Sequence, residues 1–454
     1  MDNKAIILLG GPAKGTRFRP LSLHKPKPIF PIGGVPLIYH TIESLSKVPN
    51  MKEIILLGCF TDLNEIEKFI YMCEEKFKIN IKYLKENEIM GSAGGIFKYK
   101  KDILLGKVDN FFVINGDVLG DMPFKEMLKF HDNFCNQEQY IIMGKYNDPS
   151  QSFNYGCISY DEKTKEILHF VEKPLEFSSN VISCGAYLFT STIFDHLQSA
   201  LTNSLKTGNE LINTRNDSQN FNNHTLDMNE SNASSETGDN ISCIKTPSHF
   251  PYKSVKLSFE LDIFPELAGK SGHLFGYILP QNTPWMQIKS SSSAIYADQM
   301  ILNLYTKNHP ELLAINSKST CTVIGNVFIH PTASVHNTSV LGPDVSICAG
   351  AIIGPGARIS HSIICDNVHI QDHAFVTCSI IGWNSIVGRW TRIEGTDCRD
   401  DISIHSLFSP QGKLNPSVTI IANDVDVHSE LVVFNAIVLP NKELKECTQN
   451  QIVL

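Results

Sequence analysis

The sequence predicts a Rossmann-like α/β domain followed by a left-handed parallel β-helix. Short apolar runs of strand length alternate with helical patterns through the first half, and apolar residues recur every six positions in the last third. At 454 residues, 42% of them apolar, the chain is too long for one ordinary core. We predict an α/β domain over 1–300, a linker over 301–321 and a β-helix over 322–454.

Charge and cysteine content exclude several classes of function. The formal net charge of −8 argues against a nucleic-acid or membrane-surface binder, because both need concentrated positive charge. The twelve cysteines show neither Cys-x-x-Cys nor zinc-site spacing, which favours a reduced, intracellular chain. No apolar run approaches the roughly 20 residues that span a bilayer, and the N-terminal run is too short for a signal peptide. We therefore expect a cytoplasmic protein with no nucleic-acid and no membrane partner.

The first element is an apolar strand over residues 5–9 that runs into Gly10 and Gly11. Glycines let a backbone approach an anion and turn its N–H groups inward. The basic residues near this loop are Lys14, Arg17, Arg19 and Lys27. This pattern predicts a phosphate loop, while the plainer alternative is an ordinary turn with solvated basic residues.

Alternating helices and strands continue beyond the loop. The patterns predict a helix ending at Ser46, a strand over 53–58, a helix over 63–77 and a strand over 81–84. In such a sheet, ligands bind at the carboxyl ends of the strands. Glu86 and the glycine-rich residues 91–95, predicted as a turn, lie at one such end. A glycine-rich N-cap of the next helix is the alternative interpretation.

A strand over 111–118, predicted to be fully buried, carries Asn115 and Asp117 near its end. A carboxylate there suits Mg²⁺, which usually binds through one or two carboxylates plus phosphate oxygens. An aspartate that merely caps the strand is the alternative. The segments that follow are a paired strand unit over 154–158 and 169–174, strands over 182–189 and 273–279, and a helix over 291–308.

Residues 203–250 interrupt this order. Ten asparagines fall between Asn203 and Asn240, mixed with serine, threonine and acidic residues. Such a composition cannot bury enough apolar surface to fold. We predict a disordered surface insertion.

The last third has a period of six residues. One register holds Ile329, Val335, Leu341, Ile347, Ile353 and Ile359, and it slips by about one residue near Cys365. Three hexads per coil is the pattern of a left-handed β-helix, whose apolar residues stack inward. Its flat coils are surfaces for subunit contact. The histidines in this region, predicted as exposed turn residues, are His330, His336, His361, His369 and His373.

A polar segment over 395–413 interrupts the coils. It is either a plain loop or an interaction arm.

Several motifs together resemble the sugar-1-phosphate nucleotidyltransferases: the first glycine loop with Gly15-Thr16-Arg17, Pro26-Lys27-Pro28, Asn115 with Asp117, and Glu172-Lys173-Pro174. Outside the insertion, nearly the whole chain is similar to the regulatory alpha subunits of GDP-mannose pyrophosphorylase. The features shared with them are the three residues at 12–14 that lengthen the first loop, the segments 19–22 and 285–290, and the extra loop after Thr396.

The resemblance implies a degenerate GDP-mannose pocket. Its contacts would be Gly10, Gly11, Lys27, Glu86, Gly91, Asn115, Asp117, Gly156, Glu172, Lys173, Ser183 and Gln287. Catalytic members carry an aspartate at 287 as the second Mg²⁺ ligand and an asparagine at 183. Asp117 is then the one metal-ligand candidate, and Arg17, Lys27 and Lys173 are vestigial catalytic candidates. No cofactor is implied for regulation, and Mg²⁺ is implied only if the chain is catalytic.

Three functions follow from these patterns. The first is a catalytically inactive regulatory subunit that binds GDP-mannose, inhibits a catalytic beta subunit and forms homo- and hetero-oligomers through the β-helix. The second is a working guanylyltransferase that makes GDP-mannose and pyrophosphate from GTP and mannose 1-phosphate. The third is a scaffold of the translation initiation exchange complex, whose gamma and epsilon subunits share this two-domain plan. Gln287 argues against the active guanylyltransferase. The retained Glu172-Lys173-Pro174 argues against the scaffold.

Overall fold

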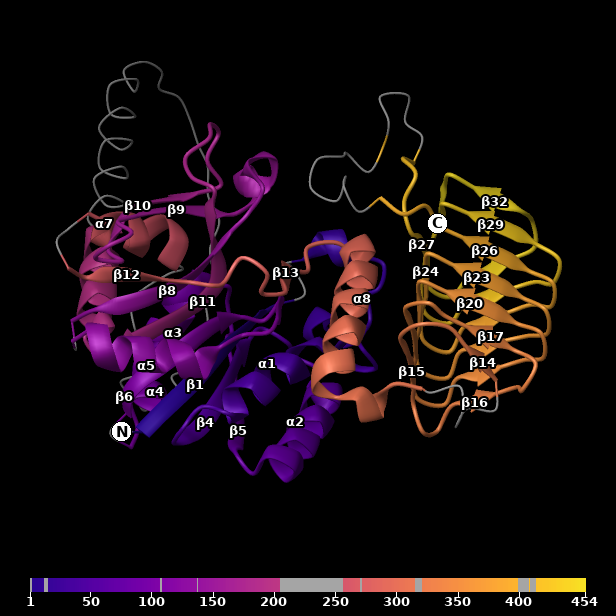
Figure 1. The fold of residues 1–454 in the computed structure, drawn as a ribbon, viewed down its shortest axis with the longest axis horizontal. Helices are drawn as coiled ribbons and strands as arrows, with labels where there is room; N and C mark the ends of the chain where they lie inside the picture. Colours follow the sequence, from indigo (N-terminus) through magenta and orange to yellow (C-terminus); the bar gives the residue numbers. More distant parts are fainter. Residues whose placement is uncertain are drawn as a thin grey trace, which may run out of the picture.

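The computed structural model describes residues 2–11, 15–106, 108–136, 138–204, 256–269, 272–314, 321–398, 408 and 414–454. Two lobes are visible in Figure 1, an α/β domain and a stack of coils, with helix α8 (Ser291–Asn308) between them. Nearly all of the predicted insertion at 203–250, the loop residues 12–14 and most of the segment 395–413 lie outside the described residues.

A mixed sheet forms the centre of the α/β domain, in the order β10-β9-β11-β6-β1-β4-β5, with β8 paired to β11 and β12 paired to β8. β1 pairs in parallel with β4 and β6, and β4 pairs in parallel with β5, so their carboxyl ends meet at one edge. The strands are β1 (Asp2–Gly10), β4 (Met51–Gly58), β5 (Asn80–Lys85), β6 (Val108–Asn115), β8 (Tyr140–Tyr146), β9 (Gly156–Tyr160), β10 (Ile167–Glu172), β11 (Val181–Thr190) and β12 (Leu274–Ile278). The strands predicted for this domain are confirmed, with small differences at their ends.

Helices cover both faces of this sheet, and a separate apolar core lies under each face. The first core takes side chains from α1, α2, α5 and α8, and the second from α3, α4 and α7. Their bounds are α1 (Leu37–Ser46), α2 (Asn64–Phe77), α3 (Gly91–Lys98), α4 (Lys100–Ile103), α5 (Phe124–Phe134) and α7 (Phe264–Leu267). The prediction of a helix over 291–308 is also confirmed.

The prediction of a turn over residues 91–95 is wrong, because these residues form the first turns of α3. A segment from far along the chain crosses this helix end: the Leu257 carbonyl accepts from the backbone N–H groups of Ala93 at 3.0 Å and Gly94 at 3.2 Å. Gly91 has a φ of +87°, and a Cβ there would lie 2.2 Å from the Leu257 oxygen. The glycine therefore serves close backbone approach at a helix start.

Two short strands cross the open edge of the domain. β13 (Trp285–Gln287) pairs antiparallel with β7 (Val118–Gly120), and Gln287 lies opposite Val118. This pairing brings Gln287 beside Asp117, the residue that precedes β7.

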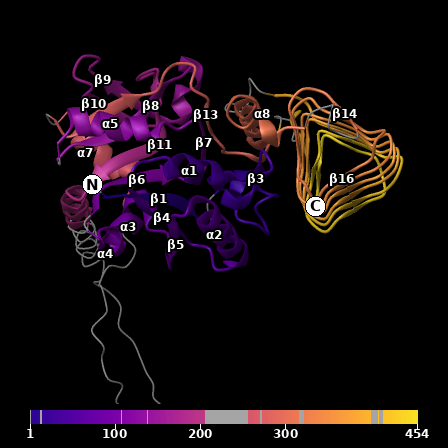
Figure 2. The ribbon, with the colours of Figure 1, turned by 60° about the horizontal axis from the view of Figure 1, so that its bottom comes forward.

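In the described part of residues 322–453, the strands fall into three parallel sheets that wind into a triangular coil (Figure 2). Leu341 pairs with Ile359, eighteen residues further on, whereas Ile359 pairs with Val376, seventeen residues further on. The predicted β-helix and its slip by one residue are therefore confirmed. In the predicted register, Leu341, Ile347, Ile353 and Ile359 are buried, as the period requires, while Ile329 and Val335 in the first coil are half-buried.

The bounds of these strands complete the fold. One sheet holds β14 (Thr322–Val323), β17 (Val340–Leu341), β20 (Arg358–Ser360), β23 (Phe375–Thr377), β26 (Arg392–Glu394), β29 (Val432–Phe434) and β32 (Thr448–Gln449). The second holds β15 (Val327–Ile329), β18 (Val345–Ile347), β21 (Ser362–Ile364), β24 (Ser379–Ile381), β27 (Thr419–Ile421), β30 (Ile437–Val438) and β33 (Ile452–Val453). The third holds β16 (Ser334–Val335), β19 (Ile352–Ile353), β22 (His369–Ile370), β25 (Ile386–Val387), β28 (Asp426–Val427) and β31 (Glu443–Leu444).

The histidines of the β-helix only partly match their prediction. His336 and His373 are exposed, while His330, His361 and His369 are half-buried. His361 lies 3.3 Å from the Asp344 carboxylate, and the exposed His373 ring stacks on Trp390 with centroids 4.2 Å apart.

Helix α8 joins the two domains through a buried carboxylate. Asp298 is 2% exposed and accepts from the backbone N–H of Gly33 at 2.6 Å and from the Ser346 hydroxyl at 2.8 Å. Burial raises the pKa of Asp298 to about 7. Near the C-terminal side of the coils, Tyr296 of the same helix donates to Asp397 at 2.9 Å and accepts from the Cys398 N–H at 2.8 Å.

No helix in the described residues is both long enough and apolar enough to cross a bilayer.

Candidate functional site

A long cleft runs along the carboxyl edge of the parallel strands. It consists of a cavity of about 630 Å³ and an adjoining one of about 460 Å³. Both cavities are lined by Lys27, Asn115, Asp117 and Gln287, so they are two halves of one cleft with these residues at its middle. The parallel register explains the gathering, because the segments that follow β1, β4, β5 and β6 all emerge at this edge.

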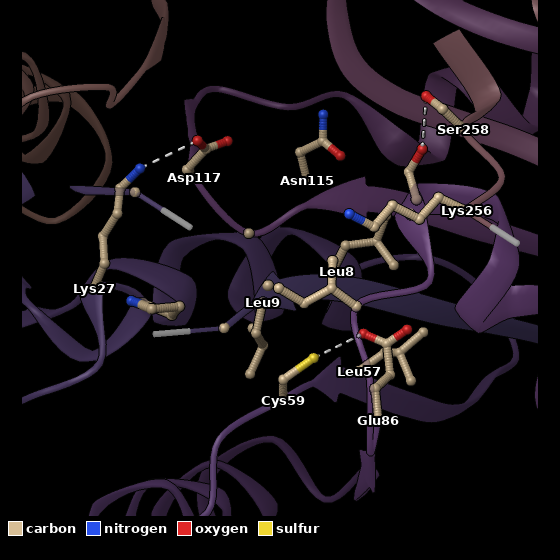
Figure 3. A pocket seen from close by; sticks show the side chains of 18 of the residues that line it. Leu8, Leu9, Lys27, Leu57, Cys59, Glu86, Asn115, Asp117, Lys256 and Ser258 are labelled. Carbon is tan, nitrogen blue, oxygen red and sulfur yellow. Dashed lines mark hydrogen bonds and ion pairs between the residues drawn. The ribbon is translucent and has the colours of Figure 1, made fainter. Parts of the chain in front are cut away.

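The larger half has an apolar floor and a buried acid. Leu8, Leu9 and Leu57 line it, and Glu86 follows β5 with 8% of its surface exposed. The Cys59 thiol lies 3.6 Å from the Glu86 carboxylate, and Figure 3 shows the two side chains pointing at each other. Such a lobe suits a flat, partly polar ring, because apolar faces and a few placed polar groups are typical of small-molecule sites.

Gly10 and Gly11, which line the larger half of the cleft, occupy positions where a side chain would clash or strain the backbone. A Cβ on Gly11 would lie 2.8 Å from the Cβ of Cys59. Gly10, at the end of β1, has a φ of +72°, which side chains other than glycine rarely adopt. The predicted close approach of the first loop therefore has a physical basis in its described residues.

At the middle of the cleft, Asp117 is held by two donors. The Lys27 ammonium donates to one of its oxygens at 3.1 Å, as Figure 3 shows, and the Gln287 amide donates to the other at 3.0 Å. The same lysine also donates to the carbonyl of Ile288, whose backbone N–H donates to the Asp117 carbonyl at 2.8 Å. Lys27 is 14% exposed and Asp117 31%, so the pair is largely shielded from water.

These contacts do not fit a divalent cation. Mg²⁺ needs oxygen ligands, yet an ammonium and an amide N–H occupy the two oxygens of Asp117. Among the described residues, no group of three or more histidine, cysteine or acidic side chains is placed to hold a metal. The predicted metal ligand therefore lies in the cleft as part of an ion pair.

The smaller half of the cleft carries charged groups at the end of β10 and in the segment after β13. Glu172 ends β10, and its carboxylate lies 3.2 Å from the Lys173 ammonium. Gly156 begins β9, and a Cβ there would lie 2.9 Å from the Glu172 carboxylate. Ser183, on β11, accepts from the backbone N–H of Gly185 at 3.3 Å. This half therefore presents both acceptors and donors, as a polyhydroxylated ligand requires.

Lys289 enters the same half from the other side. Its ammonium donates to the Asn154 carbonyl at 2.6 Å and lies 3.7 Å from the centroid of the Tyr155 ring. Burial, together with the nearby positive charges of Lys173 and Arg17, lowers the pKa of Lys289 to about 8.

Glu260 is a site residue that the sequence analysis missed. It lines both halves of the cleft, and its carboxylate accepts from the hydroxyls of Ser258 at 2.6 Å, Ser92 at 2.7 Å and Tyr187 at 3.1 Å. It lies in the π-helix η4 (Phe259–Ile263), which follows the undescribed residues 205–255. No motif marks it, because two of its three partners, Ser92 and Tyr187, come from distant segments of the chain.

All of the predicted pocket residues line one of the two cavities. The larger is lined by Gly10, Gly11, Lys27, Glu86, Gly91, Asn115, Asp117 and Gln287, and the smaller adds Arg17, Gly156, Glu172, Lys173 and Ser183. The structure thus brings together predicted residues that lie as far apart in the sequence as Gly10 and Gln287.

Two family models match the chain. The model described as nucleotidyl transferase matches residues 4–238, and the model described as GMPPB C-terminal domain matches residues 323–453. A solved structure of a putative glucose-1-phosphate thymidylyltransferase from Bacillus anthracis, in complex with a sucrose, matches 65% of this chain and 94% of its own, with 17% identity and a TM-score of 0.46.

Full-length relatives are similar to the chain along its whole length. The mannose-1-phosphate guanylyltransferase regulatory subunit alpha-A of Danio rerio is 42% identical, covering 99% of this chain and 100% of the relative. The mannose-1-phosphate guanyltransferase alpha-B of Xenopus laevis is 41% identical, and the regulatory subunit alpha of Homo sapiens is 38% identical, both with the same coverage.

Proposed function

The chain belongs to the family of mannose-1-phosphate guanylyltransferase regulatory subunits alpha, and from this premise we propose that it binds GDP-mannose in its cleft and inhibits a catalytic partner subunit without itself catalysing the transfer. The partner is the catalytic beta subunit of GDP-mannose pyrophosphorylase. The effect is feedback control of the GDP-mannose supply for glycosylation in the cytoplasm.

The observation that carries this proposal is the pairing of Asp117 with Lys27 and Gln287. Nucleotidyl transfer depends on cations that bridge the phosphates and neutralise the charge that develops during displacement. In this cleft the one carboxylate at the metal position already binds an ammonium and an amide. A ligand can bind there. The divalent cation that would lower the barrier to nucleotidyl transfer, however, has no free carboxylate oxygen at Asp117.

The shape of the cleft supports a nucleotide sugar as the ligand. Volumes of about 630 and 460 Å³ lie within the range of small-molecule sites. The apolar half with Glu86 suits the base, and the half with Glu172 suits sugar hydroxyls. The middle, where both halves meet at Lys27, then takes the diphosphate. Regulation needs no metal cofactor in this proposal.

The β-helix is the part of the chain that contacts the catalytic partner subunit in this proposal. The flat sheets of the β-helix are surfaces for homo- and hetero-oligomers. The segment 395–413 is the interaction arm, and its described root is held by Tyr296 of α8 through Asp397 and Cys398.

A second candidate is an active guanylyltransferase, which would require Mg²⁺. The observation that favours it is that the cleft retains Arg17, Lys27 and Lys173, which would bind the phosphates, Asp117, which would hold Mg²⁺, and Glu172, which would bind sugar hydroxyls. Release of Asp117 from Gln287 would have to precede metal binding in that case.

Reconstitution with the catalytic beta subunit tests the proposal. We expect pyrophosphate release by the beta subunit to fall as GDP-mannose is added, and to fall at lower GDP-mannose when this chain is present. A variant with Glu172→Ala should lose that sensitivity, because the sugar end of the cleft is impaired. An identical inhibition curve with and without the chain would contradict the regulatory function.

A further inference from the structure

The charges that line the smaller half of the cleft do not cancel. They are Arg17, Lys27, Asp117, Glu172, Lys173, Glu260 and Lys289. Lys27 is paired with Asp117 at 3.1 Å and Lys173 with Glu172 at 3.2 Å. Among the described residues, neither Lys289 nor Arg17 has a carboxylate within the 4.0 Å that defines an ion pair. Within the described part of the chain, Arg17 and Lys289 therefore face the cavity without an ion-pair partner, and with Glu260 counted the four cations exceed the three carboxylates by one.

Lys289 is the more constrained of these two cations. Arg17 is exposed, whereas Lys289 is half-buried between the Asn154 carbonyl and the Tyr155 ring. A partly buried ammonium without a counter-ion is costly unless a ligand supplies the negative charge. The Asn154 carbonyl and the Tyr155 ring, both neutral, hold the Lys289 ammonium at the cavity wall without any ligand.

The position of Lys289 identifies the part of the ligand that it meets. Lys289 lines only the smaller half, next to the Glu172–Lys173 pair, whereas Lys27 lines both halves. Ile288 links the two lysines, because its carbonyl accepts from Lys27 and it directly precedes Lys289. A diphosphate at the middle of the cleft would thus have Lys27 on the nucleoside side and Lys289 on the sugar side.

We propose that Lys289 is a ligand-binding residue that contacts the sugar-side phosphate of a bound nucleoside diphosphate sugar and takes the place of a divalent cation, so that this chain binds its ligand without metal. The inference rests on the proposed function, since it concerns the same cleft. It adds Lys289 as a contact residue that the motifs of the first loop and of Glu172 do not imply, and it gives the metal independence of the proposed function a structural cause.

Binding of GDP-mannose to the full chain, measured by calorimetry with excess EDTA or with Mg²⁺, tests this inference. We expect the unaltered chain to bind equally under both conditions. Lys289→Met should weaken GDP-mannose binding about tenfold to a hundredfold, as expected for loss of a charge-assisted hydrogen bond, and Lys289→Arg should restore most of the affinity. Binding of GMP, which has no sugar-side phosphate, should change less than about twofold.

Two controls separate ligand contact from a structural role. Lys163→Met removes the same charge from an exposed turn residue outside the cleft, and its GDP-mannose affinity should equal that of the unaltered chain. Thermal unfolding of ligand-free Lys289→Met should give an equal or higher Tm, because an uncompensated, partly buried charge is removed. A lower Tm together with equal losses of GMP and GDP-mannose binding would overturn the inference in favour of a structural role.

Failure of the inference is distinguishable from failure of the proposed function. If the chain binds GDP-mannose but only with Mg²⁺, or if Lys289→Met binds as tightly as the unaltered chain, the inference is wrong and the proposed function stands. If the unaltered chain binds no GDP-mannose under either condition, both are wrong.

Discussion

The side-chain amide of Gln287 donates a hydrogen bond to the carboxylate of Asp117 at 3.0 Å, although the two residues are 170 positions apart in the sequence. The antiparallel pairing of β13 with β7 creates this contact, because it sets Gln287 opposite Val118. Lys27 takes the other carboxylate oxygen at 3.1 Å. Each oxygen of the Asp117 carboxylate therefore has one donor, an ammonium or an amide.

The first prediction concerns Gln287→Asp. A second carboxylate beside Asp117 repels it, so we expect the ligand-free protein to lose about 1 kcal/mol of stability. Because two adjacent carboxylates suit Mg²⁺, added Mg²⁺ should restore the lost stability. Thermal unfolding with and without Mg²⁺ measures both effects. The control, Gln287→Leu, removes the amide without adding charge and should show no response to Mg²⁺; an equal response in both variants would contradict the prediction.

The second prediction concerns Lys27→Met. Removing the Lys27 ammonium leaves the largely shielded Asp117 carboxylate without its cation. We expect this to lower the free energy of unfolding by about 1–3 kcal/mol. GDP-mannose affinity should fall as well, because this ammonium lies where the two halves of the cleft meet. The matched control is Lys82→Met, which breaks an exposed pair with Asp102 at 2.9 Å and should cost less than about 1 kcal/mol. Urea unfolding measures the loss of unfolding free energy in both variants. An equal loss in Lys27→Met and Lys82→Met would contradict the prediction.

The third prediction compares two glycines with similar backbones. Gly91 has a φ of +87° and Gly106 of +94°, so alanine is strained at either position, at a cost of roughly 1–2 kcal/mol. A Cβ at Gly106 meets nothing within 4 Å, whereas a Cβ at Gly91 would lie 2.2 Å from the Leu257 oxygen. We therefore expect only Gly91→Ala to displace the segment that carries Glu260. Calorimetric titration should then find GDP-mannose binding weakened in Gly91→Ala and unchanged in Gly106→Ala.

The fourth prediction concerns pH and the domain junction. Burial raises the pKa of Asp298 from 3.8 to about 7, so between these pH values the folded chain binds more protons than the unfolded chain. Its contribution to stability is therefore lost as pH rises through this window, by an amount on the order of 3 kcal/mol. Asp298→Asn does not titrate. We expect its stability relative to the unaltered chain to improve between pH 5 and 8, and parallel curves of Tm against pH would contradict this.

Much of the fold and most of the cleft are predictable because their causes are local or periodic. The six-residue period fixes which side chains face the inside of the β-helix, and the change of period near Cys365 appears in the structure as successive coils of seventeen residues in place of eighteen. Asp117 follows the end of β6 and Glu172 ends β10, so a sheet topology is enough to predict that such residues gather at an edge.

The remaining features depend on contacts between distant segments. Residues 91–95 form a helix because Leu257 crosses them, and no pattern near Gly91 encodes that crossing. Glu260 is held by hydroxyls from Ser92 and Tyr187, on α3 and β11, which a linear pattern cannot join. Single-residue propensity is overridden wherever such tertiary contacts decide the local structure.

The central claim is that the cleft binds GDP-mannose and does not make it. The most direct test measures both on one sample of the purified chain: calorimetric titration with GDP-mannose, and pyrophosphate release from GTP and mannose 1-phosphate with Mg²⁺. The pairing of Asp117 with Lys27 and Gln287 predicts binding without detectable pyrophosphate. Sustained release of pyrophosphate by the unaltered chain would contradict the account, and the absence of GDP-mannose binding would contradict it equally.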